Sequence, residues 1–338
     1  FIPMNTFGHL FRVHIFGESH GACVGITIDG CPAGLPIQES DFIEDTERRK
    51  GGVQKGTTPR KEDDLPIFKS GIFKGFTTGA PITILFENNN TRSEDYDKHR
   101  EVPRPGHADF TAHAKYGGFE DYRGGGHFSG RLTVCLVAAG VIAKKLLATT
   151  GGIQVHSKIL EIGGETDLDK GLQVAIDAKD SIGGIVDCTA SNLPVGLGEH
   201  FFDSIESMLA HAVFSIPAVR GIEFGTGFAA AKMFGVDHND AILDASGKTS
   251  TNHAGGIVGG ISNGNDLYFK IAIKPTASTP KEQQSWNWER NIVEPFSVKG
   301  RHDLCIALRV PVVLEAVTSM VLVDLMLRTQ QMPLIIKD

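Results

Sequence analysis

Residues 132–147, LTVCLVAAGVIAKKLL, decide the fold that we expect for this chain. The stretch is apolar almost all the way round a helix, and such a helix must be buried on most sides. Its alanines, Ala138, Ala139 and Ala143, permit neighbouring elements to approach closely. The sequence therefore predicts a helix inside a core, with other elements packed around it.

Two more segments have the spacing of helices. Between residues 202 and 213, apolar side chains recur every three or four positions, with polar side chains on the other face. The stretch 311–328 begins with proline, which is favoured in the first turn of a helix. It carries only Glu315 and Asp324 as interior charges. We expect this last segment to be a second core helix.

Other segments predict strands that occur in groups. In residues 267–273, larger apolar side chains alternate with Tyr268, Lys270 and Ala272, which indicates a sheet with one buried face. Because helices do not alternate regularly with the strands, we predict an α+β fold with helices packed against antiparallel sheet, and not a doubly wound fold. The predicted strands are residues 10–16, 24–29, 81–86, 153–162, 184–189 and 267–273.

The composition is that of a globular protein, and it limits the partners. The chain has 338 residues, 41% hydrophobic and 22% charged, and no linker or charge block divides it. We expect one domain over residues 4–338, preceded by a three-residue remnant at 1–3. A formal net charge of -7 argues against a nucleic-acid binder that relies on an overall positive field. Any site for an anion must therefore be local.

Cysteines and apolar runs bear on where the protein works. The five cysteines are odd in number, scattered and without a CxxC pair, which suits a reducing compartment better than a disulfide framework. The longest apolar run, residues 132–143, is shorter than the ~20 residues that a membrane helix needs. Lys144 and Lys145 close that run. We expect a cytoplasmic protein without a membrane span.

Arginines and lysines gather in two segments. Such runs form either a solvated basic face or a binding site for an anion, and the sequence leaves both interpretations open. The first segment contains Arg48, Arg49, Lys50, Lys55, Arg60 and Lys61, and the second contains Arg92, Arg100, Arg104, Arg123 and Arg131.

Two histidines lie in turns that contain glycine. His20 follows a predicted strand in GESHG (17–21), and His107 lies in RPGHAD (104–109) beside an arginine. Unperturbed histidine titrates near pH ~6.5, so either imidazole could move a proton at neutral pH. A loop histidine with a purely structural hydrogen bond is the alternative. Asp109 either orients the imidazole of His107 or caps the helix that begins near Phe110.

A third glycine-rich segment, DYRGGGHFSGR at 121–131, runs into the predicted core helix. It would place backbone N–H groups at a helix N-terminus, where phosphate binds well. A plain long turn is the alternative. Three consecutive glycines are entropically costly, however, unless the backbone must approach something closely.

Other motifs are incomplete. Residues 252–261 are rich in glycine but lack the strand-then-helix setting of a dinucleotide site. GKT at 247–249 is not a P-loop, because isoleucine stands at 242 where a glycine is needed. We find no strong zinc spacing and expect no metal site. A Cys–His nucleophile within 299–305 is disfavoured, because neighbours in sequence rarely face one another.

Taken together, these segments resemble the chorismate synthase family. The motifs occur in the family's order and span almost the whole chain. They are GESHG at Gly17, RRKGG at Arg48, RSEDY at Arg92, RPGHAD at Arg104, DYRGGG at Asp121, NHAGGI at Asn252, KPTAS at Lys274 and GRHD at Gly300. The resemblance implies conversion of 5-enolpyruvylshikimate 3-phosphate to chorismate and phosphate, the final step of the shikimate pathway. This anti 1,4-elimination requires reduced FMN although nothing is oxidised overall.

The same resemblance implies catalytic roles. No carbonyl lies beside the hydrogen lost from C6, so the flavin is thought to lend electron density as phosphate leaves, with N5 accepting that hydrogen. His107 would protonate the reduced flavin, and His20 the departing phosphate. Asp303 would work beside flavin N5, with Ser19 and Ser129 in supporting hydrogen bonds.

Binding residues follow from the resemblance as well. The substrate's phosphate and carboxylates would be held by Arg49, Lys61, Arg104, Arg131 and Arg301. Flavin contacts correspond to His127, Phe128, Ser129, Pro217, Ala218, Gly259, Lys274, Pro275, Thr276, Ala277, Ser278 and Arg301. Arg49 and Lys55 fall at positions associated with NADPH in some members.

The family's fold and assembly give further expectations. The resemblance implies a β-α-β sandwich, with long core helices between two antiparallel sheets, and a homotetramer. The flavin is reduced either by this protein with NADPH or by an external flavin reductase. The chain departs from the family at 127–133, where it reads HFSGRLT and many members read RSSARET, and at Leu304, where proline is usual.

Two other functions remain open at this point. A phosphoryl transferase or phosphatase would use the same arginine-rich loops, but it needs a metal site or a complete nucleotide loop. A non-catalytic flavin-binding protein would explain the glycines, but not so many titratable groups within them.

Overall fold

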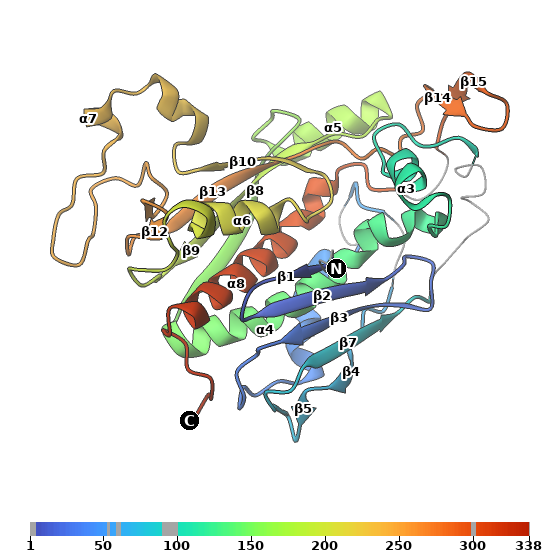
Figure 1. Cartoon of the computed structure of the whole chain (residues 1–338). Helices are drawn as coiled ribbons and strands as arrows, with labels where there is room; N and C mark the ends of the chain where they lie inside the picture. The colour runs from blue at the N-terminus through green and yellow to red at the C-terminus, as the bar shows by residue number, and fades with distance from the viewer. Residues whose placement is uncertain (1–4, 53–54, 59–61, 90–100, 299–301, 338) are drawn as a thin grey trace.

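Two antiparallel sheets enclose a layer of helices in this computed structural model, which describes residues 5–52, 55–58, 62–89, 101–298 and 302–337 (Figure 1). The two longest helices run through the middle, between the sheets. This arrangement confirms the predicted α+β class and the β-α-β sandwich. Helices do not alternate with parallel strands as they would in a doubly wound fold.

The first sheet has five strands in the order β1-β2-β3-β7-β4, and each neighbouring pair is antiparallel. On β3, Val24, Ile26 and Ile28 alternate onto the buried face, which follows from the two-residue period of a strand. The strands are β1 (Thr6–Phe7), β2 (Arg12–Gly17), β3 (Cys23–Asp29), β7 (Ile82–Glu87) and β4 (Ile67–Ser70).

The second sheet has four antiparallel strands in the order β10-β13-β9-β8. Strand β13 covers the residues predicted, and its apolar side chains are buried at every second position while the side chains between them are half-buried. The strands are β10 (Val219–Phe224), β13 (Leu267–Ile273), β9 (Gly184–Ser191) and β8 (Gln154–Ile162).

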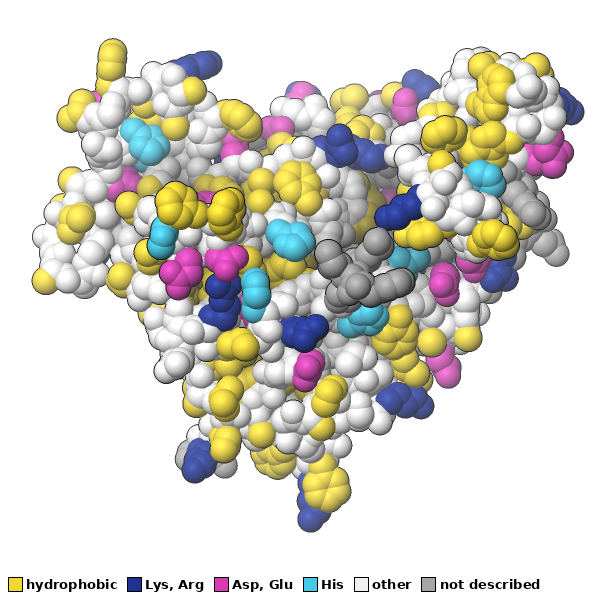
Figure 2. All heavy atoms as spheres, in the orientation of Figure 1, with side chains coloured by type: hydrophobic (Ala, Val, Ile, Leu, Met, Phe, Trp, Pro, Cys, Tyr) yellow, Lys and Arg dark blue, Asp and Glu magenta, His cyan; other side chains and the backbone are white. Residues whose placement is uncertain are grey.

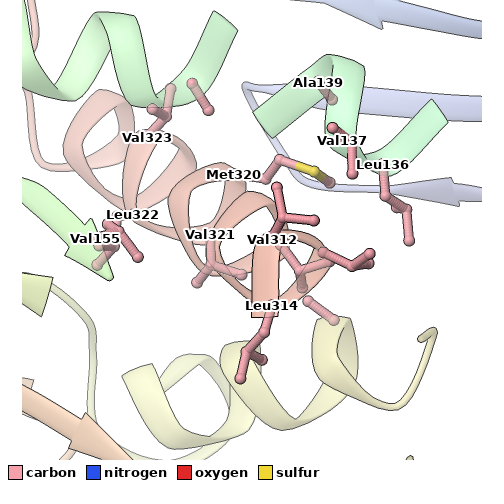
Figure 3. Packing of buried hydrophobic residues seen from close by; sticks show 14 of the residues in the cluster. Leu136, Val137, Ala139, Val155, Val312, Leu314, Met320, Val321, Leu322 and Val323 are labelled. Carbon is pink, nitrogen blue, oxygen red and sulfur yellow. The ribbon is translucent and has the colours of Figure 1, made fainter. Parts of the chain in front are cut away.

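Helices α4 (Thr133–Gly151) and α8 (Val310–Arg328) pack against each other between the sheets. Helix α4 lies on β3, while α8 lies on β8, β9 and helix α6 (Ile205–Val213). Figure 3 shows Val312, Met320 and Val323 among the interlocking side chains. The closest approach is at Gly140, where an added Cβ would overlap the side chain of Ala316. The glycine, more than the neighbouring alanines, sets the spacing of the two helices.

Both core helices have the length and hydropathy of membrane spans. The segments 130–151 and 306–328 contain 22 and 23 residues, and their apolar windows are 72% and 94% buried inside the fold. Helix α4 continues past Lys144 and Lys145, so counting its uninterrupted apolar run was an insufficient test. Burial inside the protein accounts for the apolar character of both helices.

The two interior charges of α8 tie distant segments to the core. Both carboxylate oxygens of Glu315 accept hydrogen bonds from Arg48, each at 2.7 Å. Asp324 accepts with one oxygen from the backbone N–H groups of residues 9, 10 and 11, at 3.0, 2.6 and 2.8 Å. A buried carboxylate is tolerated when it is hydrogen-bonded in this way. Asp324 thereby fixes the turn that precedes β2.

Smaller elements surround this frame. The predictions missed the short helix α1 and strand β10, whose apolar residues are few or mixed with polar ones, and they missed helix α5 although its apolar residues recur at helical spacing. The remaining elements are α1 (Ile43–Arg49), α3 (Asp109–Tyr116), α5 (Leu168–Ala178), α7 (Gly235–His238) and the two-stranded pairs β5 (Ile72–Phe73) with β6 (Phe76–Thr77), β11 (Ile257–Val258) with β12 (Ile261–Ser262), and β14 (Gln283–Asn287) with β15 (Ile292–Phe296).

Candidate active site

A cavity of about 850 Å³ lies beside the N-terminal ends of α4 and α8. In Figure 2, histidine side chains and several lysine or arginine side chains gather near the middle of the face shown. Most of the site residues expected from the sequence line this cavity. They are Arg49, Arg104, His107, His127, Phe128, Ser129, Arg131, Pro217, Ala218, Lys274, Thr276, Ala277, Ser278 and Asp303.

The triple glycine of residues 124–126 separates the two predicted catalytic histidines. A Cβ at Gly124 would lie 2.5 Å from His20 Nε2 and 3.0 Å from Ser19 Oγ, and a Cβ at Gly125 would lie 3.1 Å from His107 Cε1. All three glycines have positive φ, which other residues rarely adopt. The glycines are therefore needed because the backbone passes directly between two imidazoles.

This contact changes our interpretation of the glycine loop. The three glycines have non-helical backbone angles that kink the segment 123–128, and a separate 3-10 turn at 130–132 follows, so the glycines do not open the long helix directly. Ser129 caps the second turn, and its hydroxyl accepts a hydrogen bond from the backbone N–H of Arg131 at 3.3 Å. The loop approaches side chains closely, as its glycine content predicted, but the partners are histidines of the same chain.

His107 is held by Asp109. The distance from His107 Nδ1 to Asp109 Oδ1 is 2.6 Å, and Arg104 donates to both oxygens of the same carboxylate at 2.7 Å. Burial raises the pKa of Asp109, but the hydrogen bonds from Arg104 and His107 outweigh it and hold that pKa well below its ordinary value. Helix α3 has no side-chain cap. Of the two roles considered for Asp109, the structure therefore shows the orienting contact.

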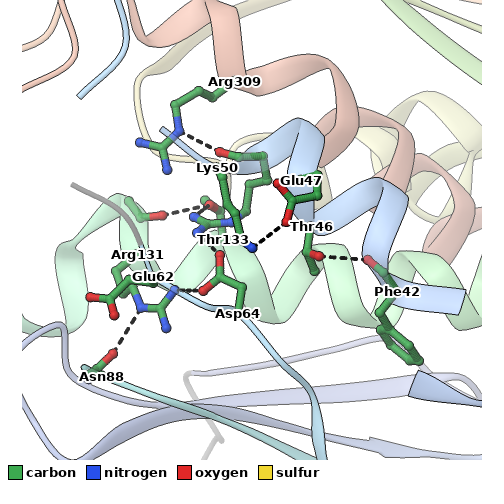
Figure 4. A network of polar contacts seen from close by, with 12 residues as sticks. Phe42, Thr46, Glu47, Lys50, Glu62, Asp64, Asn88, Arg131, Thr133 and Arg309 are labelled. Atoms are coloured by element: carbon green, nitrogen blue, oxygen red, sulfur yellow. Dashed lines mark hydrogen bonds and ion pairs between the residues drawn. The ribbon is translucent and has the colours of Figure 1, made fainter. Parts of the chain in front are cut away.

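Arg49 and Arg131 share one buried carboxylate, that of Asp64. Arg49 donates to Asp64 Oδ2 at 2.7 Å, and Arg131 donates to Oδ1 (Figure 4). Arg131 also donates to the side-chain oxygen of Asn88 at 3.0 Å. Burial lowers the pKa of Arg49 to about 10, against the opposing effect of Asp64, so the guanidinium keeps its charge at neutral pH. The pair presents a fixed positive surface to the cavity.

Asp303 is held by a different arginine, Arg309. Its Oδ1 accepts from the backbone N–H of Thr58 at 2.8 Å, and its Oδ2 accepts from Arg309 at 2.9 Å. Arg309 also donates through Nε to the backbone oxygen of Arg49 at 2.7 Å. The acid expected beside the flavin is thus fixed at both oxygens.

His127 makes contacts that its place in the motif did not predict. Its Nδ1 lies 2.8 Å from the backbone oxygen of Gly17, and its Nε2 lies 3.2 Å from Asn5 Oδ1. Since the carbonyl can only accept, Nδ1 carries a proton in this contact. The histidine ties the glycine loop to β2 and to the segment before β1, while its ring still lines the cavity.

Several predicted residues lie away from the cavity lining. Ser19 and His20 are buried behind Gly124, which does line it. Lys55 is exposed and donates to Gln173 Oε1 at 3.1 Å. Pro275 is not a lining residue, and Gly259 lies in the turn between β11 and β12. The expected ligands Lys61 and Arg301 fall outside the described residues.

Sequence reasoning gave no specific role to several charged residues of the site, among them Asp64, Arg309 and Lys50. Asp64 and Arg309 organise the arginines and Asp303, and Lys50 lines the cavity while pairing with Glu47 at 2.6 Å. Asp64 meets Arg131 across 67 positions of sequence, so no local spacing could reveal it. A single cation at the start of an otherwise apolar helix was the one available signal for Arg309.

The cavity combines an apolar wall with cations. Val13 and Ile15 of β2, Leu136 of α4 and Met320 of α8 contribute apolar surface. Within the part of the chain that the structure describes, no group of three or more His, Cys, Asp or Glu side chains could hold a metal ion. This combination suits a ligand with a flat apolar portion and anionic groups.

Comparisons with known proteins agree with this geometry. The sequence model of the family described as "Chorismate synthase" matches residues 11–327. The chain is 69% identical to a chorismate synthase of Chitinophaga pinensis, over 99% of this chain and 100% of that one, and 45% identical to one of Dehalococcoides mccartyi over the same shares. A solved structure titled "Crystal Structure of Chorismate Synthase" matches with a TM-score of 0.71 and 25% identity, over 95% and 93% of the two chains. The chain therefore belongs to the chorismate synthase family of phosphate lyases and has that family's fold.

Proposed function

We propose that this chain converts 5-enolpyruvylshikimate 3-phosphate to chorismate and phosphate by anti 1,4-elimination, with reduced FMN as cofactor. The observation that carries the proposal is the glycine loop, which packs Gly124 on His20 and Gly125 on His107. Two groups that can each donate a proton are thereby held on either side of one strand of backbone. An elimination that needs a protonated leaving group and a second acid uses such a pair.

The residues present fit a flavin mononucleotide. Two buried side-chain atoms of the cavity lining, Arg49 Nε and Thr276 Oγ1, have no hydrogen-bond partner among the described residues, which suits polar atoms that await a ligand. Phe128, Pro217, Ala218 and the segment 274–278 would hold the cofactor. Once bound, reduced FMN would supply electron density as phosphate leaves and regain it afterwards.

The two histidines have separate positions for proton transfer. A carboxylate can only accept, so His107 carries a proton on Nδ1 against Asp109. Its Nε2 lies 3.3 Å from Arg104 Nη2 and would exchange a proton with the flavin once that contact opens. His20, on the other side of the glycine loop, would protonate the departing phosphate, with Ser19 in a supporting hydrogen bond. Ser129, at the cap of the following turn, would support these contacts.

The buried arginines would bind the substrate's anionic groups. Arg49, Arg104 and Arg131 are 3%, 5% and 6% exposed, so they act where little water screens them. Asp64 and Asp109 hold these guanidinium groups in place before the ligand arrives, which lowers the ordering cost of binding. We retain Lys61 and Arg301 as further substrate ligands and Asp303 as the acid beside the flavin.

An anaerobic assay tests the proposal. Protein, chemically reduced FMN and the enolpyruvyl substrate are mixed, and release of phosphate and the absorbance of chorismate are followed. We expect His107→Ala to slow turnover by about 10²-fold or more, the usual scale for an acid-base group. His156→Ala, at an exposed position on β8, is the control. A folded, flavin-bound wild-type protein that forms no chorismate would refute the assignment.

The source of electrons requires a second assay. NADPH and oxidised FMN are supplied in air, with and without an external flavin reductase. Product without the added enzyme would show that this chain uses NADPH itself, and Lys55→Ala and Arg49→Ala would then raise the KM for NADPH. Product only with the added enzyme would assign reduction to the external partner.

We propose that the chain forms a cytoplasmic homotetramer of single-domain subunits. One hydrophobic cluster extends through both sheets, which supports a single domain over residues 4–338, and all five cysteines are free thiols, which suits a reducing compartment. Glu223, Lys270, Asp187 and Lys158 lie opposite one another in a row across the second sheet.

The signs of that row alternate, and although Asp187 is buried, a two-fold rotation would bring Glu223 of one copy opposite Lys158 of another. This arrangement supports self-association through the second sheet. Light scattering after size exclusion would give the mass of the assembly. Lys270→Glu should reduce that mass, while Lys281→Glu, at an exposed site outside the row, should not.

A further inference from the structure

We propose that Arg309 is a positioning residue for Asp303, an inference that rests on the proposed function. Neither the family motifs nor any assigned role includes Arg309. Its Nη1 donates to Asp303 Oδ2 at 2.9 Å, while the N–H of Thr58 donates to Oδ1 at 2.8 Å. Donors on both oxygens prevent the carboxylate from rotating. Arg309 and Asp303 both line the cavity, so the fixed group faces the ligand.

The guanidinium of Arg309 is itself fixed. Its Nε donates to the backbone oxygen of Arg49 at 2.7 Å, at the C-terminal end of α1, where carbonyl groups have no partner within the helix. The Arg309 side chain is 18% exposed, and that of Asp303 is 10% exposed. Because Arg309 also begins the buried helix α8, its backbone cannot shift without moving the core.

The contact joins three segments that surround the cavity. Arg309 links the end of α1 to Asp303, and Asp303 links α8 to the segment 55–58. A parallel backbone bond, from the N–H of Leu304 to the oxygen of Gly56 at 2.8 Å, supports the last of these links. Without the guanidinium, Thr58 is the one remaining donor to Asp303 among the described residues, and the carboxylate can turn toward the positive charges of Arg49 and Arg131. The acid would then leave the place where the reaction needs it.

Kinetics of Arg309→Ala in the anaerobic assay test the proposal. We expect kcat to fall by about 10- to 100-fold, the usual cost of losing a group that orients a functional side chain. The KM for substrate should change less than twofold, because Arg309 is not a substrate ligand. Arg309→Lys should retain part of the activity, since one donor remains. Arg290→Ala, at an exposed ion pair, is the control.

A double-mutant cycle separates positioning from a general loss of structure. If Arg309 acts through Asp303, Asp303→Ala together with Arg309→Ala should be no slower than Asp303→Ala alone. Additive effects would overturn the proposal. Should Arg309→Ala fail to fold, the same cycle is run with Arg309→Lys. The proposal then requires that Asp303→Ala combined with Arg309→Lys has the same kcat as Asp303→Ala alone.

Hydrogen exchange in the flavin-free protein gives a readout that does not depend on turnover. A carboxylate that is free to rotate should hold the Thr58 amide less firmly, so exchange of that amide should be faster in Arg309→Ala than in the wild type and at most as fast as in Asp303→Ala. If Arg309→Ala showed unchanged exchange and a normal kcat, the positioning role would be refuted. The proposed function would still stand in that case, provided that the wild-type protein forms chorismate. Absence of chorismate in the wild type would refute the function instead.

Discussion

Replacing Asp64 by asparagine should destabilise the protein strongly. The carboxylate is 2% exposed and accepts hydrogen bonds from Arg49 on one oxygen and Arg131 on the other. Asparagine has nearly the same shape and tolerates the positive φ of 51° at this position. It offers one oxygen, however, so its NH₂ group must face one of the guanidinium donors.

The size of the effect follows from these contacts. Losing one charge-assisted hydrogen bond costs about 1.5–3 kcal/mol. The two arginines also keep their charges without a compensating carboxylate, which brings the expected loss to about 3–5 kcal/mol. At about 2–4 °C per kcal/mol for domains of 150–250 residues, the melting temperature should fall by roughly 6–20 °C.

Urea and thermal unfolding measure this difference. Asp63→Asn is the matched control, because its side chain is exposed and should change stability by less than about 0.5 kcal/mol. If Asp64→Asn unfolded at the same urea concentration as the wild type, the carboxylate would not be holding the arginines.

The pH dependence gives a second test of the same carboxylate. Burial raises the pKa of Asp64, but Arg49 and Arg131 outweigh it, so the folded-state pKa lies below its ordinary value of 3.8. A depressed pKa contributes stability that is fully present above pH 3.8 and is lost as the pH falls through the folded-state value. The gap between wild type and Asp64→Asn should therefore be constant from pH 5 to 7 and shrink below pH 3.8. A gap that widened in acid would contradict the assigned ion pairs.

Three further outcomes are expected. Gly140→Ala should destabilise the protein by about 1–3 kcal/mol, because the new methyl group overlaps helix α8. Gly235→Ala, where the added methyl group has open space, should not destabilise it. Equal unfolding midpoints for the two variants would contradict the close packing. Asp324→Ala should cost about 2–4 kcal/mol and speed amide exchange at Phe11, since three backbone N–H groups lose their acceptor; slow exchange would show that another group holds them. A thiol reagent should label Cys23 first in the native protein, because burial raises the pKa of the other four thiols, and rapid labelling of a second cysteine would disprove that burial.

The sequence was sufficient for elements with a strong and continuous period. Residues 267–273 alternate strictly, so their burial could be stated before the structure was known. Helix α5 was missed although Leu168, Leu172 and Ala175 recur at helical spacing, so this element was available from the sequence. The spacing of the core helices depends on Gly140 meeting Ala316, a pairing between segments that no local pattern encodes.

The candidate site was predictable where a motif names the residue and unpredictable where a partner completes it. Arg49 and Arg131 stood out as arginines in motifs, but Asp64, which holds both, lies in an ordinary acidic turn. The glycine triplet indicated a close approach, yet only the structure identified His20 and His107 as the groups approached. Residues that are far apart in the sequence but in contact in the fold show no recurring spacing from which the contact could be predicted. Such contacts determine how the side chains of the site are oriented.

The contact between Asp324 and the turn at residues 9–11 has a consequence for biosynthesis. Phe11 precedes Asp324 by 313 residues, and at about 5–20 residues per second a ribosome needs roughly 15–60 s to make that stretch. Throughout that interval the strands of the first sheet have already been made, but the Asp324 carboxylate that binds residues 9–11 has not. The turn that precedes β2 can gain this anchor only when the last helix leaves the exit tunnel. A chain that terminates before Asp324 lacks this anchor, and we expect its N-terminal strands to be more open to pairing with other chains.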